Sequence, residues 1–318
     1  MNVSVLGYGR WGSFLAWYMN SIGHHVTLYG RKSSDNFAQL VKTRQNSYVK
    51  LDPAIRLVSE LDEALKNQYI FISINSQNLR MLMQEISKYD LKDKTIVLCM
   101  KGIEEYSGKR LTEVAAEYVE NINSVAIWVG PGHIQDFVTG IPNCMLVDAY
   151  NDSLKKELAQ LLNSRLIRIY IGTDVIGNEI GAAAKNAYGI AAGMLDALGY
   201  GSLKGAMIVR SAVEVSRLVE SLGGSIRSVY GLCFLGECET TFFSKYSNNR
   251  LFGENFINGI ETNKLCEGIY TVKALCRLAE TSGIEMPICQ SLNDILQKKI
   301  EAQTAFSNLF LRSMKEEF

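Results

Sequence analysis

The chain has 318 residues, of which 47% are hydrophobic and 21% are charged. At about 150 residues per domain, this length predicts two domains, and the composition excludes disordered, collagen-like and coiled-coil proteins. Lys plus Arg and Asp plus Glu number 33 each, so the formal net charge is zero. That balance indicates no nucleic-acid partner, although it leaves room for a local basic pocket.

The cysteines and the N-terminus indicate a cellular compartment. Seven Cys are an odd number without a CxxC motif, and the closest pair, Cys233 and Cys238, has no His nearby. We therefore expect reduced thiols and no metal site or disulfide framework. Residues 3–7 lack the pattern of a signal peptide, and no apolar run approaches the ~20 residues of a membrane span. The prediction is a cytoplasmic protein with no membrane span.

The first half of the chain alternates short apolar runs with amphipathic stretches. Eight runs predict strands, at 3–6, 25–29, 55–58, 69–74, 95–100, 124–129, 144–147 and 166–170. Apolar residues at helical spacing in 78–89 and 108–119 predict helices between strands. Strands that are almost continuously apolar and that alternate with helices are typical of a doubly wound, mostly parallel sheet with both faces covered.

After residue 172 the pattern becomes purely helical. Apolar residues recur at helical spacing from Ile180 to Leu198, and 204–222 and 269–282 predict further helices. We expect an α/β fold in which a Rossmann-type sheet over residues 1–172 precedes an all-helical domain over residues 173–318.

A glycine motif follows the first predicted strand. Gly7, Gly9 and Gly12 form GxGxxG between a strand and a helix. In that context the glycines serve a tight turn, the approach of a pyrophosphate and close helix packing, so residues 1–172 are expected to bind a dinucleotide. The second strand ends in Tyr29-Gly30-Arg31-Lys32 without the acid that binds the ribose of NAD. Arg31 slightly favours NADP over NAD, with a solvated loop side chain as the alternative.

Two lysines are candidates for proton transfer to a carbonyl oxygen. Lys101 follows a predicted strand and is therefore expected at the carboxyl edge of the sheet, where ligands of this fold bind. Lys185 lies within the long helix, among Gly181, Ala182 and Gly189. We interpret these small neighbours as room for a ligand, with an ordinary solvated lysine as the alternative.

The chain resembles the NAD(P)-dependent glycerol-3-phosphate dehydrogenase family over almost its whole length. The matching segments, in family order, are 7–12 (GYGRWG), 101–104 (KGIE), 130–131 (GP), 181–186 (GAAAKN), 193–199 (GMLDALG), 249–253 (NRLFG), 266–268 (CEG) and 283–288 (GIEMPI). The resemblance implies reversible hydride transfer between dihydroxyacetone phosphate and sn-glycerol 3-phosphate. It also implies a role in glycerophospholipid biosynthesis, a small phosphorylated substrate and a homodimer.

The resemblance also implies roles for individual residues. Lys185 becomes the catalytic general acid and base. Substrate contacts are expected from Lys101, Gly130, Lys185, Asn186, Glu237, Ser247, Asn248, Asn249 and Arg250. Contacts to NAD or NADP are expected from Gly7, Gly9, Arg10, Trp11, Gly12, Arg31, Ser76, Lys101, Ile134 and Glu267.

Three positions depart from the family pattern, and all three concern the substrate. Gly132 replaces a hydroxyl residue, Glu237 replaces an Asp, and Asn248 replaces an Arg expected to clamp phosphate and cofactor together. An Asn lacks the charged fork of an Arg. Two alternatives therefore stay open: a related NAD(P)-dependent reductase acting on another small hydroxy or phosphorylated compound, and a catalytically silent NAD(P)-binding sensor.

Overall fold

The chain forms two compact units in the computed structural model, which describes residues 1–262, 264–314 and 316–317. Unit 1 comprises Met1–Lys101 and Lys109–Glu179, and unit 2 comprises Gly102–Gly108 and Ile180–Phe318. The domain boundary at residue 172 stays a prediction.

Unit 1 is built on one eight-stranded sheet. Its strands are β1 Asn2–Leu6, β2 His25–Tyr29, β3 Arg56–Val58, β4 Tyr69–Ile72, β5 Thr95–Leu98, β6 Val125–Val129, β7 Asn143–Ala149 and β8 Ile167–Ile171. They lie in the order β3-β2-β1-β4-β5-β6-β7-β8, and every neighbouring pair is parallel except β6 and β7. All eight predicted strands are therefore confirmed, each with ends within two residues of the prediction.

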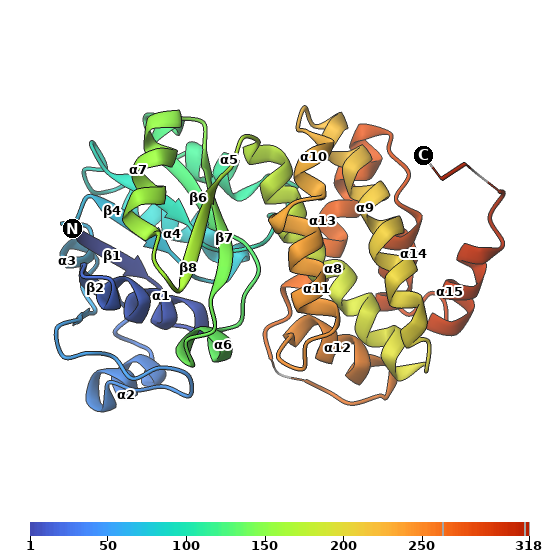
Figure 1. Cartoon of the computed structure of the whole chain (residues 1–318), viewed down its shortest axis with the longest axis horizontal. Helices are drawn as coiled ribbons and strands as arrows, with labels where there is room; N and C mark the ends of the chain where they lie inside the picture. Colours follow the sequence, from blue (N-terminus) through green and yellow to red (C-terminus); the bar gives the residue numbers. More distant parts are fainter. Residues whose placement is uncertain (263, 315, 318) are drawn as a thin grey trace. The chain divides into compact units, whose positions relative to one another are not determined.

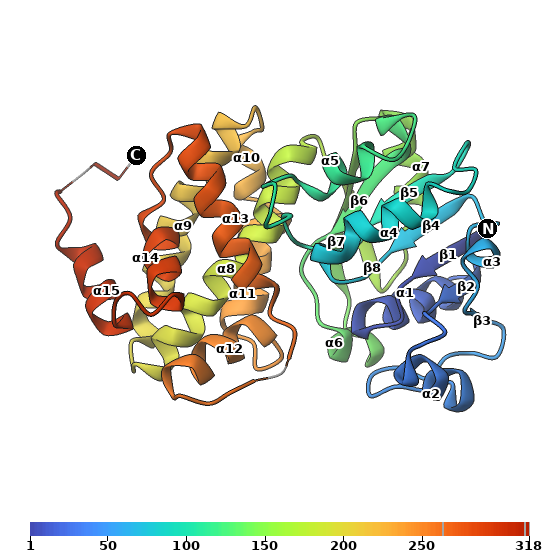
Figure 2. The ribbon, with the colours of Figure 1, turned by 180° about the vertical axis from the view of Figure 1, so that it is seen from behind.

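Helices cover both faces of this sheet, with α1 and α7 in front in Figure 1 and α4 and α5 in front in Figure 2. The helices of unit 1 are α1 Arg10–Ser21, α2 Asp35–Thr43, α3 Leu61–Ala64, α4 Leu79–Ile86, α5 Leu111–Ala116, α6 Ile134–Val138 and α7 Asp152–Leu162. Helix α5 is shorter than the predicted 108–119, because Gly108 has a φ of 73° and Arg110 is extended. The covered faces explain why the strands are apolar: every residue of β4, β5 and β6 is buried.

Unit 2 is helical, as predicted, and contains no strand among its described residues. Helix α8, Val175–Ala197, begins in unit 1 and continues in unit 2. The other helices are α9 Lys204–Ser221, α10 Ile226–Val229, α11 Glu237–Phe242, α12 Asn248–Ile257, α13 Glu267–Ser282, α14 Pro287–Leu296 and α15 Ala302–Phe310.

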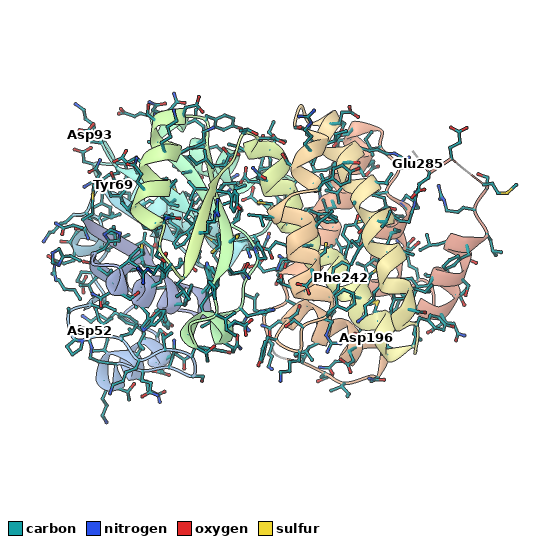
Figure 3. The ribbon with its side chains drawn as sticks, in the orientation of Figure 1. Asp52, Tyr69, Asp93, Asp196, Phe242 and Glu285 are labelled. Carbon is teal, nitrogen blue, oxygen red and sulfur yellow. The ribbon has the colours of Figure 1, made fainter. Side chains whose placement is uncertain are left out.

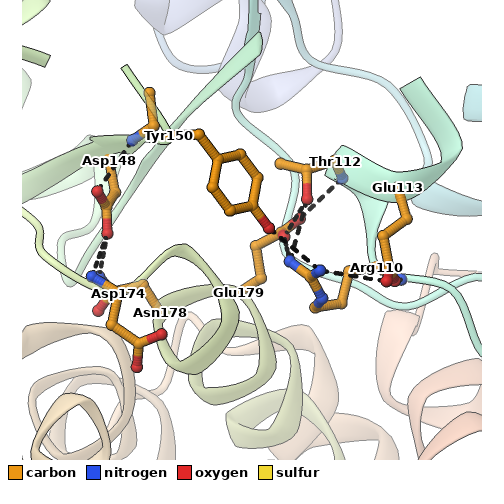
Figure 4. Close-up of polar contacts among 9 residues, drawn as sticks. Arg110, Thr112, Glu113, Asp148, Tyr150, Asp174, Asn178 and Glu179 are labelled. Carbon is orange, nitrogen blue, oxygen red and sulfur yellow. Dashed lines mark hydrogen bonds and ion pairs between the residues drawn. The ribbon is translucent and has the colours of Figure 1, made fainter. Parts of the chain in front are cut away.

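The first turns of α8 are fixed by buried polar contacts within unit 1 (Figure 4). Arg110 Nη1 donates to Glu179 Oε2 at 2.8 Å, and the backbone N–H of Thr112 donates to Glu179 Oε1 at 3.0 Å. Asn178 Nδ2 donates to Asp148 Oδ2 at 2.8 Å. Burial raises the pKa of Glu179, and its paired Arg110 opposes that shift. These partners explain why α8 starts before Ile180, where the apolar pattern begins.

A buried carboxylate joins three helices of unit 2. Glu214 of α9 is 3% exposed and accepts hydrogen bonds from the backbone N–H groups of Ile288 and Cys289, at 2.7 and 3.3 Å. These groups belong to the first turn of α14, which has no side-chain cap of its own, so Glu214 supplies the missing acceptor. The Tyr188 hydroxyl of α8 donates to the same carboxylate at 3.0 Å.

We predict that Glu214 makes stability depend on pH between about 4.5 and 7. Burial raises its pKa from 4.5 to about 7 in the folded chain, so the folded state binds this proton more tightly than the unfolded state. Its stabilising contribution is complete below pH 4.5 and is lost as the pH rises through 7. In urea unfolding, the stability of the parent relative to Glu214→Gln should fall by about 3 kcal/mol from pH 4.5 to 8. The Glu220→Gln variant, at an exposed position of the same helix, should show no such trend.

Candidate functional site

The glycine motif forms the turn between β1 and α1. Gly7 has a φ of 112°, and a Cβ there would lie 2.1 Å from the Ser73 carbonyl oxygen. A Cβ at Gly12 would lie 1.9 Å from the Gly7 carbonyl oxygen. These two glycines are therefore required by the turn and by the packing of helix on strand.

Gly9 differs from the other two glycines of the motif. It precedes the first residue of α1, has an ordinary φ of −61°, and has no atom within 4 Å of the place that a Cβ would take. The fold itself therefore does not require a glycine here. The open space at the N-terminus of a twelve-residue helix fits a pyrophosphate, which would accept hydrogen bonds from the free N–H groups.

Lys101 lies at the carboxyl edge of the sheet, as predicted. Its Nζ donates to the Gly130 carbonyl oxygen at 2.7 Å and lies 5.8 Å from the centre of the Trp11 ring. Gly130 directly follows β6, and Trp11 lies in the first turn of α1. The structure thus brings together, around the glycine turn, three residues predicted to contact cofactor or substrate.

The other residues predicted to bind the cofactor differ in how exposed their side chains are. Arg10 is exposed and its guanidinium lies over the Tyr48 ring, 5.5 Å from the centre, while Arg31 is exposed just after β2. Ser76 is buried and accepts a hydrogen bond from Gln77 Nε2. The side chain of Ile134 belongs to the core of unit 1, so only its backbone is available to a ligand.

Lys185 is held by two side chains of α11. Its Nζ lies 2.9 Å from Glu237 Oε2 and 3.1 Å from Thr241 Oγ1. Glu237 is only 1% exposed, so its carboxylate is an ion-pair partner removed from water. The alternative of a solvated Lys185 is wrong, because the lysine side chain is 13% exposed.

The small residues around Lys185 serve helix packing. A Cβ at Gly181 would lie 3.1 Å from Phe234 Cβ, and one at Gly189 would lie 2.7 Å from Thr241 Cγ2. Our interpretation of these two glycines as room for a ligand is therefore wrong. They let the segment that carries Glu237 approach α8 closely enough for the ion pair to form.

Asn186 and Asn249 form a side-chain pair next to Lys185. Asn249 Nδ2 donates to Asn186 Oδ1 at 2.9 Å, and Asn249 Oδ1 accepts from the Gly268 backbone N–H at 3.0 Å. Glycines permit this contact as well, since a Cβ at Gly253 would lie 1.9 Å from the Ile190 carbonyl oxygen. Glu267, predicted to contact the cofactor, opens α13 immediately before Gly268.

The predicted phosphate segment lies at the N-terminus of α12. Ser247 caps this helix by accepting the Arg250 backbone N–H at 3.2 Å, and Asn248 Nδ2 donates to the Leu265 carbonyl oxygen at 3.4 Å. Arg250 Nη1 contacts Asp196 at 2.5 Å and Glu254 at 3.2 Å.

Asp196, which is labelled in Figure 3, is shared by two cations. Its second carboxylate oxygen lies 2.6 Å from Lys204 Nζ, while Arg250 Nε donates to the Ser244 carbonyl oxygen at 3.0 Å. Because of these contacts, the Arg250 guanidinium can offer a phosphate only its remaining N–H groups. Neither Asp196 nor Lys204 is among the predicted site residues.

The departure at Gly132 has a local physical reason. Its φ is 149°, and a Cβ would lie 2.4 Å from the Phe137 ring. A Ser or Thr at this position would be strained and would require the ring to move, so this loop excludes the hydroxyl residue of the family pattern.

Sequence reasoning missed Thr241 as a partner of Lys185. Thr241 and Glu237 are four residues apart on α11 and therefore lie on the same helix face. That spacing was available in the sequence once Glu237 was matched to the family acid. Within the described ranges, no cluster of three or more His, Cys, Asp or Glu side chains is suited to a metal ion, and no helix is long and apolar enough to cross a membrane.

Comparisons with known proteins identify the family. Residues 2–155 match the description "NAD-dependent glycerol-3-phosphate dehydrogenase N-terminus", and residues 174–307 match the corresponding C-terminus. The glycerol-3-phosphate dehydrogenase [NAD(P)+] of Chlorobium limicola is 33% identical, with 100% of this chain and 99% of the relative covered. The enzyme of the same name from Clostridium botulinum is 32% identical, with 99% and 98% covered.

A solved structure agrees with these relatives. The crystal structure of glycerol-3-phosphate dehydrogenase from Coxiella burnetii has a TM-score of 0.91 and is 26% identical, with 98% of this chain and 99% of that chain covered. The chain therefore belongs to the NAD(P)-dependent glycerol-3-phosphate dehydrogenase family.

Proposed function

We propose that this chain interconverts dihydroxyacetone phosphate and sn-glycerol 3-phosphate, using NAD or NADP. The observation that carries the proposal is the pairing of Lys185 with the buried Glu237 in a chain of this family. A carbonyl reduction needs a proton donor of fixed position, and a lysine held by a buried carboxylate and a hydroxyl meets that need. A homodimer and a cytoplasmic location stay predictions.

The dinucleotide fits unit 1. Gly9 provides space for a pyrophosphate at the start of α1, and the N–H groups of that helix supply donors. When bound, NADH or NADPH supplies the hydride. For the finer choice between the two we propose NADPH, because Arg31 follows β2 where an acid would otherwise favour NAD.

Lys185 is proposed to carry the proton. Its ammonium would donate to the substrate carbonyl oxygen during reduction, and the neutral amine would accept the proton of the hydroxyl during oxidation. Glu237 and Thr241 would keep Nζ in one position through both directions. Asn186, held by Asn249, would bind a substrate hydroxyl next to that amine.

The substrate phosphate is proposed to bind at the N-terminus of α12. Its helix dipole and backbone N–H groups favour an anion, and Asn249 and the remaining donors of Arg250 lie in its first turn. Lys101 is proposed as a further contact to substrate and cofactor.

The test of the reaction is NAD(P)H oxidation by the purified chain with dihydroxyacetone phosphate. We expect turnover with both coenzymes and a higher kcat/KM with NADPH, because Arg31 can pair with the 2′-phosphate. Unphosphorylated dihydroxyacetone and a set of 2-oxo acids serve as controls and should react far more slowly. A flat trace with dihydroxyacetone phosphate would refute the proposed substrate.

A related reductase with another substrate is the second candidate, and three positions favour it. Gly132, Glu237 and Asn248 depart from the family pattern on the substrate side, while the glycine turn and Lys185 are intact. Oxidation of NAD(P)H with another ketone of the panel, and not with dihydroxyacetone phosphate, would support this candidate. Tight coenzyme binding without turnover on any ketone would indicate the sensor.

We predict that Lys185→Met lowers kcat by at least about 10²-fold with little change in coenzyme Kd, because the proton donor is lost. The same variant removes the cation that lies 2.9 Å from the buried Glu237 carboxylate, which costs on the order of 3 kcal/mol of stability. The double variant Lys185→Met, Glu237→Gln should recover stability and stay inactive. Turnover at the parent rate in either variant would exclude Lys185 as the proton donor.

We predict that alanine at one glycine of the turn weakens coenzyme binding, whereas alanine at another lowers thermal stability. Gly9→Ala should keep the parent Tm, because no protein atom lies near the new Cβ, and should raise the Kd for NADPH at least about tenfold by filling the pyrophosphate space. Gly12→Ala should lower the Tm, because its Cβ would overlap the Gly7 carbonyl oxygen. Thermal unfolding and coenzyme fluorescence separate the two effects; unchanged NADPH affinity in folded Gly9→Ala would place the pyrophosphate elsewhere.

A further inference from the structure

Two cysteines of unit 2 lie close together in space. Cys276 of α13 and Cys289 of α14 have their Sγ atoms 3.8 Å apart. A disulfide requires about 2.05 Å between the sulfur atoms, so the two must approach by less than about 2 Å. Rotation of a partly exposed side chain such as Cys276 can supply much of that distance.

The backbone around this pair is firmly positioned. Gly283 ends α13 in the left-handed conformation, and Pro287 begins α14 four residues later, so the two helices form a tight hairpin. Glu214 accepts the backbone N–H of Cys289 itself. The separation of the two thiols is therefore set by helices and a short connection rather than by a loose loop.

The two thiols differ in accessibility and chemistry. Cys289 is completely buried, and its contact with Cys276 together with burial raises the pKa of the Cys289 thiol. Cys276 is partly exposed, so a small oxidant in solution reaches it first. This asymmetry, an accessible thiol beside a buried one, is the arrangement of an attacking and a resolving cysteine.

We propose that Cys276 and Cys289 are a peroxide-oxidisable dithiol that closes to a reversible disulfide between α13 and α14. The Cys276 thiolate attacks hydrogen peroxide, forming an S–O bond as the O–O bond breaks and giving a sulfenic acid and hydroxide. The Cys289 sulfur then attacks the sulfenic sulfur; the S–O bond breaks, and the departing hydroxide takes the Cys289 proton. The hydroxide from the first step takes up the proton that Cys276 released on forming the thiolate, so two thiols and one peroxide give one disulfide and two waters.

The consequence is a covalent link across one hairpin in the folded state. The bond joins two residues 13 positions apart in the sequence, which stabilises the fold by restricting the unfolded chain. It also converts the buried Cys289 thiol to a disulfide, from which a reducing dithiol regenerates the thiol. The assignment is independent of the proposed reaction, since neither cysteine is among the residues assigned to it.

The test treats the full chain with a small excess of hydrogen peroxide and maps its peptides without reduction. We expect a Cys276–Cys289 cross-linked peptide that dithiothreitol removes, and a Tm that rises by roughly 3 °C or more and returns on reduction. Cys276→Ser should abolish both changes. Cys144→Ser, at another partly exposed cysteine in unit 1, should leave both intact.

Three outcomes would overturn the proposal. The first is Cys276 accumulating as sulfinic acid with Cys289 still alkylatable, and the second is Cys276 joined to a different cysteine. The third is a lower Tm after the bond forms, since this would mean that the helices must be distorted to make it. Cys276→Ser replaces one atom of a partly exposed residue, so this variant should fold and its lack of a cross-link can be interpreted.

Discussion

The ion pair between Lys185 and Glu237 is the constraint around which unit 2 is arranged. A carboxylate that is 1% exposed has lost its water, and only a close cation and good geometry offset that loss. At 2.9 Å the lysine supplies the cation, and the hydroxyl of Thr241 accepts a further hydrogen bond from Nζ. The ion pair that neutralises the buried charge of Glu237 therefore also fixes the position of the amine proposed to carry the proton.

Such a pair forms only if two helices approach closely. Gly181 and Gly189 remove the side chains that would separate α8 from the segment holding Glu237, and Gly253 removes one between α8 and α12. Each of these glycines makes no side-chain contact of its own, but its lack of a side chain allows the neighbouring residues of the two segments to lie close together. The hydrogen bond between Asn186 and Asn249 depends on the same close approach of helices, so the packing of unit 2 also sets the geometry of its candidate site.

Sequence patterns reached most of the fold and part of the site. Period and apolarity located all eight strands, and the GxGxxG context located the turn, because these signals are local. The roles of Gly181 and Gly189 were misread because a missing side chain looks the same whether ligand or protein fills the space. The partnership of Arg250 with Asp196, 54 residues away, and the approach of Cys276 to Cys289 depend on tertiary structure that no spacing encodes.

The charges near α12 bear on how a phosphate can be held. Lys204 and Arg250 are balanced by Asp196 and Glu254, so this cluster is neutral in the same way as the whole chain. With Asn at position 248, the segment has one charged fork fewer than the family pattern, and the fork that remains is partly used. A phosphate bound here would therefore rely on directed N–H groups, from the helix N-terminus and from amides, more than on net positive charge. Recognition of that kind would depend on geometry, and the close packing of α12 against α8 at Gly193 and Gly253 would then position the donors of the proposed phosphate site.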